Sequence, residues 1–163
     1  MSEAPRYTRK IADAADLQAR VAALPRPLVF TNGCFDILHV GHVDYLDRAA
    51  ALGASLVVGV NTDASVRRQG KGTDRPINAL ADRMAVLAAL ESVSLVVAFD
   101  EDTPQRLIEC LRPEHLVKGG DWPVTAIVGA DFVRGLGGRV HSIPFRHQRS
   151  TSALLRRIRD ASG

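Results

Sequence analysis

Cysteine is scarce in this 163-residue sequence, and long hydrophobic runs are missing. The two cysteines, Cys34 and Cys110, each stand in an apolar stretch rather than in a spaced ligand cluster, so we expect buried thiols. No apolar run approaches the ~20 residues that a membrane-spanning helix needs. The start, MSEAPRYTRK, has no apolar segment after its basic residues, which argues against a secretory signal. We therefore predict a cytoplasmic protein with no membrane partner.

Aromatic residues and net charge are also low, at 5% and +3, and both bear on possible partners. Many basic residues stand late, in RHQRSTSALLRRIRD, where they would suit either nucleic acid or an anionic small substrate. Because no aromatic residue is interleaved with them, we favour the small substrate and predict no nucleic-acid partner.

Short β-branched runs alternate with helical patterns along the chain, which is long enough for one sizeable core. The runs are nearly all apolar, as expected for strands buried on both faces, and cover residues 27–32, 55–61, 95–100, 115–119 and 139–144. Helical patterns lie between them, at 41–53, 79–91 and 102–113, and after Ser150. This order predicts an α/β, Rossmann-like, doubly wound five-stranded parallel sheet with helices on both faces.

The first strand begins near residue 27, which divides the chain. Residues 11–24 have the pattern of an extra helix, so we assign 1–26 to an N-terminal helical extension and 27–163 to the main domain. The longest polar interruption is RRQGKGTDRPIN, residues 67–78, and a loop of that length in a compact domain is more often functional than idle.

The segment TNGCFDILHVGH, residues 31–42, lies where the first strand passes into the first helix. In open parallel sheets, ligands bind beyond the carboxyl ends of the strands, where a strand passes into the next helix. Gly33 allows a close turn and Gly41 allows a ligand to approach the helix start, whose free N–H groups favour phosphate. Neither G-x-G-x-x-G nor G-x-x-x-x-G-K-[ST] is present, so a different phosphate chemistry is indicated.

His39 and His42 flank Gly41 and admit three interpretations: a metal site, a capping and packing role, or phosphate contact. Zinc would need a third ligand, and Asp36 and Asp44 are candidates by residue type only. For Asp36 we prefer a bracing role through backbone N–H bonds. We favour phosphate contact for the histidines, because imidazole N–H groups can stabilise charge on a phosphoryl group in transfer, and we predict no protein-bound metal.

The H-x-G-H pair within TNGCFDILHVGHVDYL resembles the signature of the nucleotidyltransferase superfamily that includes glycerol-3-phosphate cytidylyltransferase and pantetheine-phosphate adenylyltransferase. Further on, NTDASVRR, LVKGGDW and RSTSALL are similar to the adenylyltransferase half of the bifunctional heptose enzymes. The resemblance runs from about Pro27 to Arg159, without a kinase half, so the chain looks like a stand-alone form.

The resemblance implies transfer of AMP from ATP to D-glycero-β-D-manno-heptose 1-phosphate, giving ADP-heptose and pyrophosphate for lipopolysaccharide synthesis. It also implies Mg²⁺ bound with ATP, a homodimer, and a separate heptose kinase upstream. Two alternatives remain: a cytidylyltransferase for glycerol 3-phosphate or a similar phosphorylated alcohol, and a non-catalytic nucleotide-binding regulatory module.

The resemblance assigns site residues by position. His39, His42 and Lys71 would be catalytic, with His42 at the α-phosphate. Nucleotide contacts are expected from the first turn and the last helix start: Thr31, Asn32, Gly33, Phe35, Gly41, His42, Ser150, Thr151 and Ser152. Ser150 or Thr151 would also cap that last helix. Ser152 departs from the family's S-T-T pattern, which puts one hydroxyl contact in doubt.

Contacts to the sugar phosphate or the leaving group are expected from Arg75, Arg83, Lys118, Gly119, Asp121 and Trp122. Arg75 and Arg83 each carry a planar guanidinium group that can donate two parallel hydrogen bonds to a phosphate. The Trp122 ring could stack on a ligand, or it could pack as a buried hydrophobic side chain under the following loop. Arg67 and Arg68 are expected to be surface charges.

Overall fold

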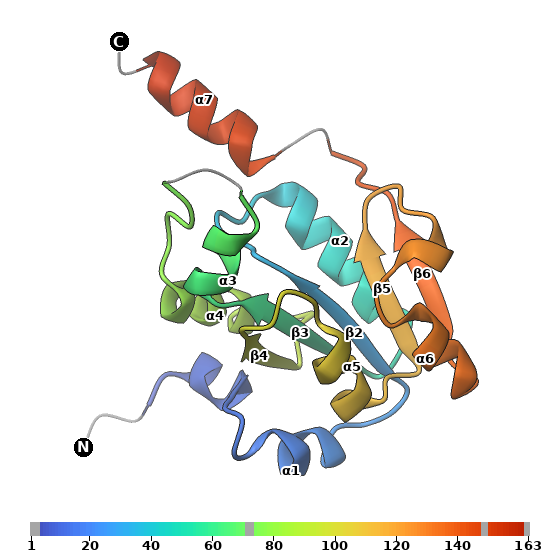
Figure 1. The fold of residues 1–163 in the computed structure, drawn as a ribbon. Helices are drawn as coiled ribbons and strands as arrows, with labels where there is room; N and C mark the ends of the chain where they lie inside the picture. The colour runs from blue at the N-terminus through green and yellow to red at the C-terminus, as the bar shows by residue number, and fades with distance from the viewer. Residues whose placement is uncertain (1–3, 71–73, 148–149, 162–163) are drawn as a thin grey trace.

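A six-stranded, all-parallel sheet organises the chain (Figure 1). The computed structural model describes residues 4–70, 74–147 and 150–161. The strand order is β1-β4-β3-β2-β5-β6, with bounds β1 (Ile11–Ala12), β2 (Leu28–Gly33), β3 (Ser55–Asn61), β4 (Leu95–Phe99), β5 (His115–Gly119) and β6 (Arg139–Ile143). The predicted parallel α/β class is confirmed, with one strand more than the five expected.

The helices between the strands are α1 (Leu17–Ala22), α2 (Val40–Ala50), α3 (Asp63–Arg68), α4 (Leu80–Ala88), α5 (Gln105–Leu111), α6 (Ala130–Gly135) and α7 (Thr151–Ala161), with short 3-10 turns η1 (Arg6–Lys10) and η2 (Val124–Ala126). Two hydrophobic clusters cover the two faces of the sheet. One joins it to α1, α5 and α6, and the other to α2 and α4. The doubly wound arrangement follows from this, since every residue of β3 is buried.

The extra strand corrects the helix expected at residues 11–24. Ile11 and Ala12 pair with Val96 and Val97 of β4, and only residues 17–22 form a helix. A two-residue strand carries no readable alternation, so pairing with β4 decides its conformation. The division of the chain after residue 26 stays a prediction, while Leu17 and Val21 pack into the common core.

Two further differences concern local structure. Residues 63–68 form α3, whose N-cap Thr62 accepts a hydrogen bond from the Ser65 N–H at 3.1 Å, so the predicted loop at 67–78 begins two residues later. Cys34 is buried as expected, whereas Cys110 is exposed, because it lies on the face of α5 opposite Ile108 and Leu111.

The last helix, α7, extends away from the sheet and has no buried residue (Figure 1). Its contact with the rest of the chain includes an ion pair of 2.6 Å between Arg159 and Asp74. No helix among the described residues is long and apolar enough to cross a membrane.

Candidate functional site

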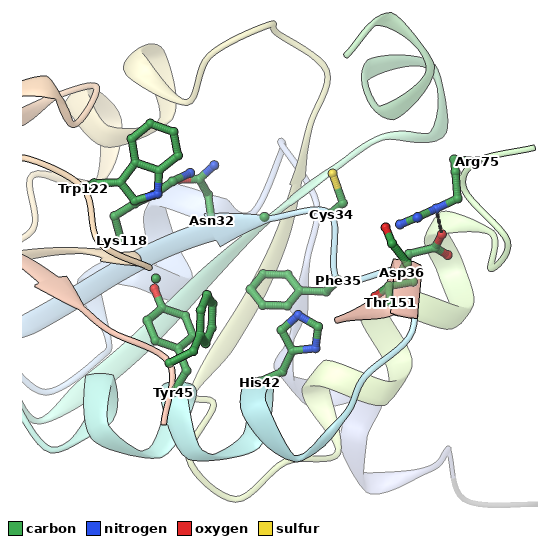
Figure 2. A pocket seen from close by; sticks show the side chains of 14 residues that line it. Asn32, Cys34, Phe35, Asp36, His42, Tyr45, Arg75, Lys118, Trp122 and Thr151 are labelled. Atoms are coloured by element: carbon green, nitrogen blue, oxygen red, sulfur yellow. Dashed lines mark hydrogen bonds and ion pairs between the residues drawn. The ribbon is translucent and has the colours of Figure 1, made fainter. Parts of the chain in front are cut away.

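A cavity of about 570 Å³ opens at the carboxyl ends of β2 and β5. These neighbouring strands lie at the point where the strand order reverses, which is where open α/β sheets bind ligands. Its volume suits a nucleotide-sized molecule. It is lined by Asn32, Gly33, Cys34, Phe35, Asp36, His42, Tyr45, Arg75, Lys118, Gly119, Trp122, Phe145, Thr151 and Ser152 (Figure 2).

The turn from β2 into α2 forms the middle of this cavity. Phe35 adopts a left-handed backbone conformation, with φ of 47°, and its ring meets the His42 ring edge-on at 5.5 Å between centroids. The first turn of α2, an 11-residue helix, carries the positive end of the helix dipole, and His42 of this turn lines the cavity. This geometry favours an anion beside His42.

His39 and His42 stack on one another, with ring centroids 3.9 Å apart. His39 occupies the N-cap position of α2, but its side chain makes no capping bond, so the capping interpretation is wrong. Gly41 accommodates the stack, because a Cβ there would lie 3.0 Å from His39 Nδ1 and Cε1. Of the two histidines, only His42 lines the cavity.

Burial keeps both rings neutral. Desolvation, followed by repulsion from His39, lowers the pKa of His42 from 6.5 to about 4, and desolvation also lowers the pKa of His39. The Nδ1 atoms of both rings are buried and have no hydrogen-bond partner in the described structure. An unpaired buried polar group costs about 1–3 kcal/mol, so this pair is a locally unfavourable feature of the fold.

Asp36 joins the turn after β2 to the last part of the polar segment 67–78. Its carboxylate accepts the Ile77 and Asn78 N–H groups, both at 2.9 Å, and the Arg75 Nε at 2.6 Å. Burial opposes ionisation, but these donors outweigh it, so the pKa of Asp36 lies below its usual value. The bracing role predicted for Asp36 is confirmed, with donors about 40 residues away rather than in its own turn.

Arg83 is buried instead of facing the main cavity. Its guanidinium donates to the Cys34 carbonyl at 2.6 Å, to the Asn78 carbonyl at 3.0 Å and to Asp63 Oδ1 at 2.7 Å. Arg83 thus holds the same two segments that Asp36 joins, and it borders a smaller pocket of about 200 Å³ with Asp36 and Asn78.

The end of β5 supplies the other side of the cavity. Lys118, Gly119 and Trp122 line it as the sequence suggested, whereas Asp121 is exposed and is not among the lining residues. Trp122 is 53% exposed, so it is not a plug under the following loop. The Trp122 backbone N–H donates to Ser142 Oγ at 3.0 Å, which fixes the backbone at this position.

The start of α7 closes the cavity from a third direction. Ser150 Oγ accepts the Ala153 N–H at 3.1 Å, which confirms the predicted cap. Thr151 and Ser152 line the cavity, and the Thr151 hydroxyl donates to the Ile37 carbonyl at 3.3 Å. Residues more than 100 positions apart therefore meet at this turn.

The remaining predicted residues lie near the cavity without lining it, or outside the described residues. Thr31 is fully buried and its hydroxyl bonds to that of Tyr45. Gly41 lies within α2, and Lys71 falls outside the described residues. Among the described residues, no group of three or more His, Cys, Asp or Glu side chains could hold a metal.

Sequence reasoning missed three lining residues: Cys34, Tyr45 and Phe145. Tyr45 stands three positions after His42, so helical spacing could have placed it on the same face. Phe145 follows β6 outside any quoted motif, and only the tertiary structure brings it to the cavity.

Comparison with known proteins identifies a family and several relatives of this chain. The family model described as cytidylyltransferase-like matches residues 30–151. The chain is 60% identical over 156 residues to the D-beta-D-heptose 1-phosphate adenylyltransferase of Bordetella bronchiseptica, covering 94% of this chain and 96% of that protein. It is 55% identical over 135 residues to the bifunctional protein HldE of Geotalea uraniireducens, covering 83% of this chain but only 27% of that protein's length.

Solved structures share the fold. The lipopolysaccharide core biosynthesis protein of Thermoplasma volcanium has a TM-score of 0.60 at 28% identity, over 75% of this chain and 98% of that one. A pantoate-beta-alanine ligase from Francisella tularensis has a TM-score of 0.62 at 16% identity, over 87% of this chain and 68% of that one, a likeness of fold alone.

Proposed function

Because the chain belongs to the cytidylyltransferase-like family, we propose that it transfers AMP from ATP to D-glycero-β-D-manno-heptose 1-phosphate. The products are ADP-heptose, for lipopolysaccharide core synthesis, and pyrophosphate. The observation that carries this proposal is the 60% identity to a heptose 1-phosphate adenylyltransferase over nearly the full length of both chains.

The reaction is an in-line displacement at the α-phosphorus of ATP. A phosphate oxygen of the sugar phosphate forms the new P–O bond, while the bond from the α-phosphorus to the α,β-bridging oxygen breaks and its electron pair leaves with pyrophosphate. A phosphate monoester has a second pKa of about 6, so the attacking group is mostly dianionic near neutrality and needs no general base. Catalysis then depends on positioning and on charge stabilisation.

His42 provides charge stabilisation at the centre of the cavity. Its pKa of about 4 makes it a neutral ring that donates an N–H bond to the α-phosphate, and that bond strengthens as charge builds in the transition state. His39 supports it by stacking, and the start of α2 adds backbone N–H groups to the same anion site.

Asp36 and Arg83 position residues 75–78, the last part of the polar segment 67–78 to which Lys71 belongs. We assign Lys71 to the phosphates of ATP, whose charge a lysine ammonium group can neutralise. Arg75 and Lys118 line the cavity and would bind the sugar phosphate and the leaving group, and Asp121 would accept sugar hydroxyls from the rim.

We propose that magnesium enters with ATP, since Mg²⁺ at nucleotide sites takes few protein ligands and the described residues hold no cluster of three or more His, Cys, Asp or Glu side chains for it. When bound, Mg²⁺ would neutralise charge on the triphosphate. The proposal includes a homodimer working in the cytoplasm, and a separate kinase that makes the sugar phosphate. In support, the chain spans only 27% of the length of a relative that is named a bifunctional protein.

The test is pyrophosphate release with magnesium, offering ATP or CTP against both anomers of heptose 1-phosphate and against glycerol 3-phosphate. We expect release only with ATP and the β-anomer. Release with CTP and glycerol 3-phosphate would replace the proposal with the cytidylyltransferase alternative. Nucleotide binding without release in any combination would favour the regulatory module.

A further inference from the structure

The main cavity opens where two neighbouring strands of the sheet separate. In the described part of the chain, β2 and β5 pair at two positions only, Val29 with His115 and Phe30 with Leu116. Both strands continue for three more residues, but from there β2 pairs with β3 alone and β5 with β6 alone. Beyond Phe30 and Leu116, backbone hydrogen bonds therefore no longer set the distance between β2 and β5.

A buried tyrosine bridges the two strands at the very next position. Thr31 and Val117 directly follow the last paired residues, and the Tyr45 hydroxyl bonds to the Thr31 hydroxyl and, at 3.4 Å, to the Val117 carbonyl. A carbonyl can only accept, so the Tyr45 O–H donates to Val117 and the Thr31 O–H donates to the Tyr45 oxygen. One side-chain hydroxyl thus continues the connection between β2 and β5 where the backbone pairing stops.

Burial of this hydroxyl keeps the bridge intact. Thr31 is fully buried and Tyr45 is 3% exposed, so water competes poorly for either hydroxyl. Burial also raises the pKa of Tyr45, which keeps the phenol protonated near neutrality. Removal of the Tyr45 oxygen would leave the Thr31 hydroxyl buried without this partner, an unfavourable state that a shift of the two strand ends would relieve.

Each of the three bridged elements carries a residue of the cavity. The next residue of β2, Asn32, and the next residue of β5, Lys118, both line it. On α2, Tyr45 also lines the cavity one helical turn after His42, and its side chain points from the helix toward the strand ends (Figure 2). The bridge therefore joins the side of the cavity that carries His42 to the side that carries Lys118.

We propose that Tyr45 is a positioning residue for the transfer reaction, because its hydroxyl sets the spacing between His42 and Lys118 across the cavity. This rests on the proposed function, in which His42 contacts the α-phosphate and Lys118 helps to bind the sugar phosphate and the leaving group. In-line displacement needs both contacts in place at once, and a misplacement of about 1 Å costs on the order of 10²-fold in rate. The Tyr45 hydroxyl is bonded to the protein, so it acts through these two side chains.

Tyr45→Phe removes the hydroxyl alone. We expect kcat for pyrophosphate release to fall about tenfold, with a change of less than about twofold in the KM for ATP and for heptose 1-phosphate. Two controls define a purely structural effect. Tyr7→Phe removes the hydroxyl of the only other tyrosine, which packs partly buried against the core, and Val96→Ala removes buried volume in β4. Both should keep the wild-type kcat, although Val96→Ala should lower the midpoint of urea unfolding.

A second background separates positioning from general weakening of the fold. If Tyr45 places Lys118 relative to His42, the loss caused by Tyr45→Phe should shrink from about tenfold to about twofold or less in the Lys118→Ala enzyme. An unchanged kcat in Tyr45→Phe, or an equal loss in both backgrounds, would overturn the proposal. Should Tyr45→Phe not fold, Thr31→Val removes the other hydroxyl of the pair and should give the same two losses.

Hydrogen exchange provides a readout that does not depend on turnover. The backbone amides of residues 32–33 and 118–119 should exchange about tenfold faster in Tyr45→Phe than in the wild type, because the strand ends open locally, whereas Val96→Ala should not single out these amides. Unchanged exchange in Tyr45→Phe would also overturn the proposal. Failure of the proposed function has a different signature: the wild-type protein would release no pyrophosphate from ATP and heptose 1-phosphate, whatever the exchange shows.

Discussion

His39 and His42 stack with ring centroids 3.9 Å apart and planes 22° from parallel, and neither Nδ1 has a partner among the described residues. Two protonated rings at this separation would repel each other, and burial adds to the cost of charging them. The pair is therefore neutral near pH 7, so the phosphate contact proposed for His42 is a hydrogen bond from a neutral ring rather than from a fixed cation. This relationship has consequences for both stability and turnover.

The first prediction concerns stability against pH. Folding lowers the pKa of His42 from 6.5 to about 4, so below pH 6.5 the unfolded chain binds a proton that the folded chain does not. The stability from a neutral His42 is thus complete above pH 6.5 and is lost as pH falls toward 4. Between pH 7 and 5, we expect the wild type to lose on the order of 1 kcal/mol more than His42→Gln. Urea unfolding of both proteins at the two pH values measures this, and parallel losses would contradict it.

The second prediction concerns turnover. His42→Ala should lower kcat by about 10²–10³ while ATP still binds. Other enzymes lose activity by this factor when one hydrogen-bond donor to the transition state is removed. Single-turnover kinetics and ATP titration separate the two effects. The control is Val43→Ala, on the same helix and 44% exposed, which should behave as wild type. Largely intact turnover in His42→Ala would mean that the histidine is only structural.

The third prediction separates a positioning role of Arg83 from substrate contact. Arg83→Ala leaves Asp63 and the carbonyls of Cys34 and Asn78 without their donor, so the free energy of unfolding should fall by about 3 kcal/mol and kcat should fall with it. Arg67→Ala, on the exposed side of α3, should change neither. A rise in the KM for heptose 1-phosphate without loss of stability would instead support direct contact. Urea unfolding and steady-state kinetics provide both readouts.

The fourth prediction compares two glycines near α6. Gly129 has φ of 85°, and a Cβ there would lie 2.6 Å from Ile108 Cδ1, so Gly129→Ala should destabilise the fold by about 1–3 kcal/mol. Gly135 ends α6 with nothing within 4 Å, so Gly135→Ala should be neutral or stabilising by about 0.5 kcal/mol. Thermal unfolding of the two variants should shift in opposite directions or differ clearly. Equal melting temperatures would refute the strain argument.

Much of the fold could be predicted because strands buried on both faces must be apolar throughout. The runs at 55–61 and 115–119 match β3 and β5 residue for residue. The edge strand at Ile11–Ala12 could not be predicted, since two residues have no periodicity and take their conformation from β4. The short helix α3 was missed for a related reason, because its six residues are mostly polar.

The sequence also determined the centre of the candidate site, because the H-x-G-H segment, Asn32, Gly33 and Phe35 lie together at one strand-to-helix turn. Local chain geometry places such residues at the carboxyl ends of the strands of a parallel sheet, where ligands bind, whatever else surrounds them. Tertiary structure alone decided the rest. Arg83 became a buried brace because Cys34, Asp63 and Asn78 converge on it, and Phe145 entered the cavity because β6 ends beside β5. Contacts between residues distant in sequence depend on how strands are ordered in the sheet, and no local pattern of side chains encodes that order.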